Sequence, residues 1–260
     1  MQRSTRAPAL ALLASALLLF SAHPASALTG YAQDFEGLNA ADPGALGADG
    51  WLVFGNVFGP GVAPFLYNYG PFPAPNNTPG FSTVDGSGQG GPNQGAQVLS
   101  VYNDYNNFDH QNGSNNVIEA NVFQEQSIAP GDVGTTWRFR FDVKPSDVLG
   151  PQAPSTALAF IKTLDPNAGF ALTNFLTVDT AVFPSLWQEG VAIDLGIDAG
   201  LSGQILQFGF LNTASNSAPT AVFYDNVSFG VVPEPGTGLL ACAALAAGAV
   251  SAARRRWRAA

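Results

Sequence analysis

The stretch from Thr136 to Lys144 constrains the fold of this 260-residue chain more than any other segment. Four apolar side chains alternate there with polar ones, namely Trp137, Phe139, Phe141 and Val143. A period of two places these side chains on one face of an extended strand. Shorter β-prone runs, separated by Gly, Pro, Asn and Asp, cover the rest of residues 28–231, where no amphipathic helix is visible. The pattern predicts an all-β domain of jelly-roll type, a β-sandwich of two packed sheets.

About ten strands are expected in this domain. They are Ala32–Phe35, Trp51–Phe54, Gln97–Tyr102, Val117–Phe123, Thr136–Lys144, Ala157–Leu164, Phe170–Val178, Glu189–Leu195, Ile205–Leu211 and Val222–Phe229. The six prolines between Gly59 and Gly80 exclude a central strand and favour an excursion across the surface. Trp137 and Trp187 lie in strand-like contexts, so we expect both in the core.

The two ends of the chain have the composition of targeting segments. Residues 1–27 carry Arg3 and Arg6 before an apolar run and then Ala25-Ser26-Ala27, which predicts a signal peptide cut by signal peptidase after Ala27. Residues 236–253 are uncharged and predict a short transmembrane helix, the alternative being a buried core helix. The basic residues that follow would hold the tail on the cytoplasmic side, namely Arg254, Arg255, Arg256 and Arg258.

Pro233-Glu234-Pro235, the apolar segment and the basic stop follow one another in residues 232–260. This order resembles the PEP-CTERM sorting signal of bacterial surface proteins. The resemblance implies recognition of the tripeptide by an exosortase, a membrane protease that removes the anchor in systems that accompany exopolysaccharide production. It implies an exported protein that is first membrane-anchored and then placed at the cell surface or in the extracellular matrix.

Charge and cysteine content narrow the partners of the region between the two ends. Residues 28–233 hold 18 acidic and four basic residues, a net charge of −14. Nucleic acids and anionic membranes bind through clustered Lys and Arg, so neither is an expected partner. Cations and neutral polymers remain compatible with this charge. Cys242, the single cysteine, lies in the predicted anchor, so the exported body has no disulfide.

Several short motifs resemble β-sandwich carbohydrate-binding modules. They are Asp34-Phe35-Glu36-Gly37, Gly50-Trp51, Pro130-Gly131 ahead of the alternating strand, and Tyr224-Asp225-Asn226-Val227-Ser228-Phe229 near the end. The resemblance implies a structural Ca²⁺ held by Glu36 and Asp225, with Asp34 as a third ligand. Carboxylate oxygens suit this ion. The alternative is that the three carboxylates are simply solvated.

Glycan binding requires exposed rings beside groups that bond hydroxyls. Tyr67, Tyr69 and Phe72 form one candidate platform, and Tyr102 and Tyr105 form another, each interleaved with asparagines. The alternative is that these rings are buried and pin down long loops.

Catalytic patterns are sparse. The sequence lacks the histidines for a His-based zinc site and has no Gly-x-Ser-x-Gly elbow. Only a carboxylate pair drawn from Glu119, Glu125 and Glu189 remains for glycoside hydrolysis. We therefore expect a non-catalytic surface or matrix protein associated with exopolysaccharide, with direct glycan binding as one form of that role. A glycan-active enzyme and a purely structural or adhesive protein are the alternatives.

Overall fold

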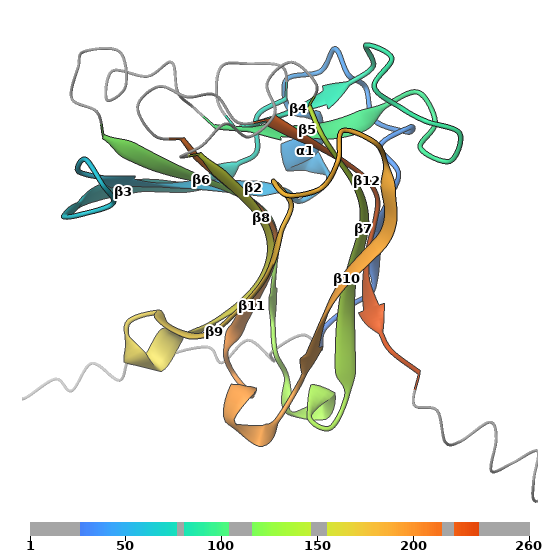
Figure 1. Cartoon of the computed structure of the whole chain (residues 1–260). Coiled ribbons are helices and arrows are strands. Elements are labelled where there is room, and N and C mark those ends of the chain that lie inside the picture. The colour runs from blue at the N-terminus through green and yellow to red at the C-terminus, as the bar shows by residue number, and fades with distance from the viewer. Residues whose placement is uncertain (1–26, 77–80, 104–115, 147–154, 215–220, 234–260) are drawn as a thin grey trace, which may run out of the picture.

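The computed structural model describes residues 27–76, 81–103, 116–146, 155–214 and 221–233. These residues form two antiparallel sheets that pack face to face (Figure 1). The predicted β-sandwich is therefore confirmed. In the described ranges no helix is long and apolar enough to cross a membrane. The predicted signal peptide, apart from Ala27, and the predicted transmembrane span lie outside these ranges, as do Glu234, Pro235 and the four arginines.

Each sheet has six strands. Sheet A has the order β10-β7-β12-β5-β4, with β1 paired to β12; its strands are β1 (Tyr31–Gln33), β4 (Ser82–Asp85), β5 (Val98–Tyr102), β7 (Thr136–Pro145), β10 (Gln188–Gly196) and β12 (Ala221–Val231). Sheet B has the order β3-β2-β6-β11-β8-β9; its strands are β2 (Leu52–Phe58), β3 (Phe65–Pro73), β6 (Val117–Ser127), β8 (Thr156–Asp165), β9 (Ala171–Asp179) and β11 (Ile205–Ala214). Helical turns are short: α1 (Ala45–Ala48), η1 (Pro130–Asp132), η2 (Pro166–Ala168) and η3 (Ala199–Leu201).

Aromatic side chains from the two sheets interlock in the core. Phe139 of β7 lies 5.3 Å from Phe208 of β11, measured between ring centroids, and Phe141 lies 5.4 Å from Phe210. Trp137 stacks on Phe229 at 4.9 Å. The alternating segment thus buries the face that its period predicts. Each Å² of apolar surface removed from water stabilises the fold by about 25 cal/mol.

The prediction for Trp187 was wrong. Trp187 precedes β10 and is half-buried, and its indole Nε1 donates to the carbonyl of Gln89 at 3.1 Å. It fastens a glycine-rich loop, residues 86–96, onto the outer face of sheet A. The position fits an amphipathic ring, which covers apolar surface and also satisfies its single donor.

The proline-rich excursion contains a strand that the sequence did not predict. Residues 65–73 form β3, the edge strand of sheet B, and their side chains are mostly exposed. An edge strand pairs on one side only, so Pro71 and Pro73 cost few ladder hydrogen bonds. The expectation that no central strand forms here is confirmed, but the segment is part of the sheet. The short strand β4 was also not predicted.

Candidate functional site

The outer face of sheet B is the strongest candidate site. The sheet bends so that this face is concave, with β3 and β9 at its two edges (Figure 1). A second apolar cluster lies on it, separate from the core between the sheets, and consists of Phe123, Phe160 and Leu211 with Leu52, Phe54 and Leu158 packed against them. Gly209 sits in register between Phe123 and Phe160, where a β-carbon would collide with the carbonyl of Val122.

A chain of hydrogen bonds crosses this apolar face. Glu119 Oε1 accepts from Asn56 Nδ2 at 2.9 Å and from Asn121 Nδ2 at 3.0 Å. Lys162 Nζ donates to Asn121 Oδ1 at 2.6 Å, so the chain joins β2, β6 and β8. The arrangement places donors and acceptors in the middle of an apolar surface.

Lys162 is held between two aromatic rings. Its Nζ lies 4.3 Å from the centroid of Phe160 and 5.0 Å from that of Phe175, within the range of cation–π attraction. Burial lowers the pKa of the Lys162 ammonium, and the nearby Glu119 carboxylate opposes that shift. The charges of Lys162 and Glu119 offset each other in the middle of the face, and Glu125 adds one exposed negative charge farther along β6.

Aromatic side chains also lie at both edges of sheet B. Phe65 of β3 contacts Phe58 of β2 at 5.8 Å, and Phe175 of β9 remains 42% exposed while it contacts Phe160 at 6.2 Å. Five inter-strand spacings of about 4.8 Å separate these edges, so the face is roughly 24 Å wide. The width suits an extended chain better than a small molecule.

The predicted tyrosine platforms lie elsewhere and differ in exposure. Tyr67 and Phe72 are exposed on β3, whereas Tyr69 is half-buried, with its ring lying over Gly55. Tyr102 is half-buried in β5, and Tyr105 lies outside the described residues. Tyr69 and Tyr102 both adjoin Phe81, through a ring contact at 5.8 Å and a backbone hydrogen bond at 2.9 Å respectively. Of the described members of the two platforms, Tyr67 and Phe72 are exposed, and Tyr69 and Tyr102 are half-buried beside Phe81.

The predicted calcium residues gather at the junction of β1, β5 and β12. We call Asp34, Glu36, Asp142 and Asp225 the acidic notch. Asp225 pairs with Asp142 across β12 and β7, and the two residues are 1% and 3% exposed. Burial, together with the charges of Asp142, Asp34 and Glu36, raises the pKa of Asp225 to about 7, although a hydrogen bond from the Asn226 backbone works in the opposite direction. The notch therefore concentrates negative charge that the protein neutralises incompletely.

Hydrogen bonds satisfy the notch unevenly. Asp142 accepts from Gly190 N at 2.8 Å, Gln94 Nε2 at 2.9 Å and Asn226 Nδ2 at 2.8 Å. Glu36 Oε1 accepts from the backbone of residues 96 and 97 at 2.6 Å. Within the described part of the chain, Asp225 accepts a single hydrogen bond, from Asn226 N at 2.6 Å. The donor chemistry fits Ca²⁺, but among the described residues no three carboxylate, imidazole or thiol groups are close enough to form a metal site.

The three glutamates proposed as a catalytic pair are not arranged as one. Glu119 and Glu125 lie on the same face of β6 six residues apart, which is about 20 Å along a strand. Glu189 belongs to sheet A, where its carboxylate accepts from Asn93 Nδ2. Glycosidase carboxylates lie about 5–9.5 Å apart, so no two of these glutamates meet that requirement.

Most residues on the concave face were not identified from the sequence. Asn56, Asn121, Lys162 and Phe175 come from four different strands, and sequence distance concealed their proximity. One available signal was Lys162, the only charge in the apolar run 157–164. A charged side chain on an otherwise apolar strand indicates that it has a polar partner nearby, which here is Asn121.

Several solved structures that resemble this fold are β-sandwich carbohydrate-binding modules. One such module, from a study of promiscuous specificity in the β-sandwich superfamily, shows 13% identity and a TM-score of 0.40, over 75% of this chain and 61% of the other. The Clostridium thermocellum xylanase 10B module pair, solved with xylohexaose, shows 13% identity and a TM-score of 0.39 over 78% and 28%. A bacteriophage CBA120 tailspike domain shows 13% identity and a TM-score of 0.42, over 75% of this chain and 22% of the other. This chain thus spans less than two thirds of each of these structures.

No protein-family model and no curated protein matches the chain. With identities of 13% and TM-scores below 0.5, we draw no functional conclusion from these structures.

Proposed function

We propose that this chain is an exported, non-catalytic protein of the cell surface or exopolysaccharide matrix, and that it binds glycan on the concave face of sheet B. The observation that supports this best is the hydrogen-bonded chain Asn56–Glu119–Asn121–Lys162, which lies beside the rings of Phe160 and Phe175. A sugar ring offers C–H faces that stack on aromatic rings and hydroxyl groups that bond to amides, carboxylates and ammonium groups. Sites of this kind combine an apolar lining with a few polar groups.

Charge favours a neutral glycan. Glu119 and Lys162 offset each other on the concave face, and residues 28–233 as a whole carry a net charge of −14. A polyanion would meet repulsion from the whole molecule with no cluster of cations to overcome it. We therefore expect uncharged polysaccharides to bind and alginate, an acidic one, to be excluded.

Affinity electrophoresis in gels that contain β-glucan, xylan, galactomannan or alginate tests the binding. Phe175→Ala should weaken retention about tenfold, which is roughly the loss of one aromatic contact. Lys162→Met should weaken it similarly, because the hydrogen bond and the charge are lost. Phe72→Ala removes an exposed ring from β3 and is the matched control.

Retention lost in Phe72→Ala or Tyr67→Ala, but kept in Phe175→Ala, would move the site to the β3 edge. If none of the neutral polysaccharides retains the unmodified protein, glycan binding itself is contradicted. A structural or adhesive role would then remain.

Export and sorting form the second part of the proposal and rest on the two ends of the sequence. We expect mature material to begin at Leu28, and we expect an exosortase to act at Pro233-Glu234-Pro235. N-terminal sequencing and intact-mass analysis of released protein measure both. An N-terminus at Met1, or a released product that retains the arginine tail, would contradict this part without affecting the binding site.

A structural Ca²⁺ in the acidic notch is the third part. Asp225 and the free carboxylate oxygens of Asp34 and Glu36 are the side chains that would hold the ion. The positive charge of the ion would compensate the negative charges of Asp34, Glu36 and Asp225, which face no cationic side chain in the hydrogen bonds of the described residues. The ion would link β1 and the loop that follows it, residues 34–37, to β12.

A further inference from the structure

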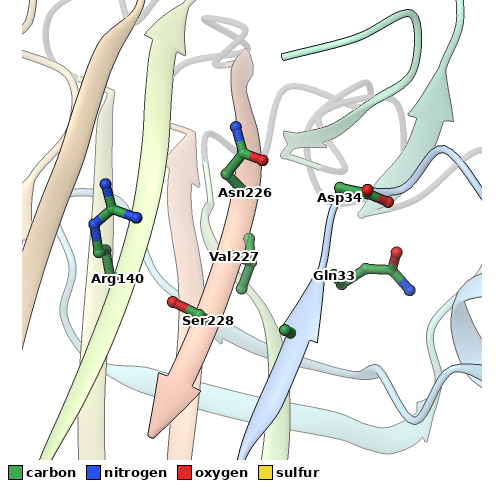
Figure 2. A pocket seen from close by; sticks show the side chains of 7 residues that line it. Gln33, Asp34, Arg140, Asn226, Val227 and Ser228 are labelled. Carbon is green, nitrogen blue, oxygen red and sulfur yellow. The ribbon is translucent and has the colours of Figure 1, made fainter. Parts of the chain in front are cut away.

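A second surface feature lies on the opposite side of the molecule. The outer face of sheet A has a hollow of about 370 Å³, lined by Ala32, Gln33, Asp34, Arg140, Asn226, Val227 and Ser228 (Figure 2). Pockets for small ligands start at about 300 Å³. The glycine-rich loop reaches the rim of the hollow, where Asn226 Nδ2 donates to the carbonyl of Asn93 at 2.9 Å.

A β-bulge builds this hollow. The pairing of β12 with β7 shifts register between Asp225 and Ser228, and Asn226 takes a left-handed backbone conformation with φ 48°. The bulge leaves Val227 in the core and brings the Asn226 amide to the outer face. Bulges re-aim side chains in this way and are frequent beside binding sites.

The floor of the hollow is a row of residues in register. Ala32 of β1 pairs with Ser228 of β12, which pairs with Arg140 of β7. The side chains of Ala32 and Ser228 are small, so a depression remains between Asp34 and Arg140. On β10, Gly190 leaves the space that the Arg140 guanidinium occupies, because a β-carbon there would lie 2.8 Å from Nη2.

The polar groups around the hollow retain unused bonding capacity. Within the described parts of the chain, neither the Arg140 guanidinium nor the Ser228 hydroxyl has a hydrogen-bond partner. Gln33 accepts from Phe35 N through Oε1, which leaves its amide donors available. Asn226 donates through Nδ2, which leaves its carbonyl oxygen available.

Arg140 differs in this respect from the other basic residues of the sandwich. Arg138 makes two hydrogen bonds to Asp194, at 2.7 and 2.8 Å. Lys144 donates to Gln89, and Lys162 donates to Asn121. Arg140 is thus the one cation of the described ranges that has no bonded partner, and it lies at the hollow.

We infer that this hollow is a second binding site, which accepts one uncharged sugar unit by hydrogen bonds alone. Donors from Arg140 and Ser228 and the carbonyl oxygen of Asn226 adjoin a volume that Ala32, Gln33 and Asp34 also line and that has no aromatic ring, a combination that suits a polyhydroxylated ligand. Asp34 and Arg140 carry opposite charges at the hollow, which favours a ligand without net charge. The inference rests on the proposed function, since it assigns the same ligand class to a new surface.

Two sites on opposite sheets give the protein a bridging role. One molecule that holds glycan on the concave face of sheet B and on the hollow of sheet A joins two separate polysaccharide chains. Linked sites also raise the apparent affinity for a polymer beyond that of either site.

Isothermal titration of the full-length protein in detergent with cellohexaose, xylohexaose and mannohexaose tests the inference. For the hexasaccharide that binds, we expect a stoichiometry of two per chain. Arg140→Ala and Ser228→Ala should each reduce it to one, and Phe175→Ala should also reduce it to one by removing the other site. Arg138 lies two residues before Arg140 on the same face of β7, so Arg138→Ala makes the same change in charge. This variant should keep a stoichiometry of two. Circular dichroism melting confirms that each variant is folded.

A stoichiometry of one in the unmodified protein, abolished by Phe175→Ala and insensitive to Arg140→Ala, would overturn the second site and leave the proposed function standing. Binding of none of the three probes would overturn both. As a second readout, the unmodified protein should increase the light scattering of a soluble neutral polysaccharide, and Arg140→Ala should not. Equal scattering with both proteins would contradict bridging through this hollow.

Discussion

Asp225 lies directly opposite Asp142 in the ladder between β12 and β7, and both carboxyl groups are almost completely shielded from water. Three donors surround Asp142, whereas one backbone N–H reaches Asp225. Burial, and after it the nearby charge of Asp142, raises the pKa of Asp225. Asp142 is the better compensated partner, so Asp225 is the group on which the stability of this region depends.

Stability should therefore fall as the pH rises when metal is absent. The pKa of Asp225 is raised to about 7 in the folded protein, above its unfolded value near 3.8. Between these values the folded state binds more protons, so the contribution of Asp225 is complete below about pH 4 and is lost as the pH passes 7. Urea unfolding in EDTA at pH 5, 6, 7 and 8 measures the effect.

Asp225→Asn should flatten this pH profile. Asp194→Asn, which removes only the surface pair with Arg138, should leave the profile's fall between pH 5 and 8 in place. A profile that is unchanged in Asp225→Asn would assign the pH dependence to another group.

Calcium should stabilise the protein most at pH 8, where Asp225 is ionised and unpaired. An ion at 100 times its Kd adds about 2.7 kcal/mol to the free energy of unfolding. Calorimetry with 5 mM Ca²⁺ against EDTA should show a higher Tm with calcium, and Asp225→Asn or Glu36→Gln should abolish the difference. Equal Tm values for the unmodified protein in the two buffers would rule out the structural ion.

Gly209→Ala should destabilise the sandwich. Its β-carbon would meet the carbonyl of Val122 and the Cα of Phe123, both of which are backbone atoms that cannot rotate away. We expect a loss of about 1–3 kcal/mol, the usual range for overpacking. Gly230→Ala is the matched control, since nothing lies within 4 Å of its β-carbon position. Chemical denaturation compares the two, and a loss in Gly230→Ala as large as that in Gly209→Ala would contradict this reason.

Trp187→Phe should loosen the glycine-rich loop while the sheets stay intact. The change keeps a ring near the Lys144 ammonium but removes the hydrogen bond to Gln89, worth about 1 kcal/mol. Hydrogen exchange should accelerate in residues 86–96 and stay unchanged in β7. Faster exchange throughout sheet A would indicate a wider role for this indole.

The fold was predictable because its signals are local. The alternation in Thr136–Lys144 matches β7, and the Asp-Asn step at 225–226 coincides with the bulge of β12. β3 was missed because Pro71 and Pro73 are compatible with a strand only at an edge, and edge position is a property of the whole sheet.

The candidate site was less predictable because its parts are distant in sequence. The Asn56, Asn121 and Lys162 side chains form one chain of bonds through a strand order, β2-β6-β11-β8, that no local pattern specifies. Lys162 stands out in the sequence as the only charge in the run 157–164, but its contact with the Phe175 ring depends on the pairing of β8 with β9. The Asp34, Glu36 and Asp225 cluster was identified through resemblance rather than through spacing.

The pairing of β1 with β12 determines when this molecule can finish folding. Tyr31 lies opposite Phe229, nearly two hundred residues later, and in the described structure β1 pairs with no other strand. The central strand of sheet A is thus the last of the described strands to be synthesised, and β7, β5 and β1 have no common neighbour among these strands until it arrives. Folding dominated by such remote contacts is slow. Sheet B, whose six strands all precede β12, can therefore pair before sheet A is complete.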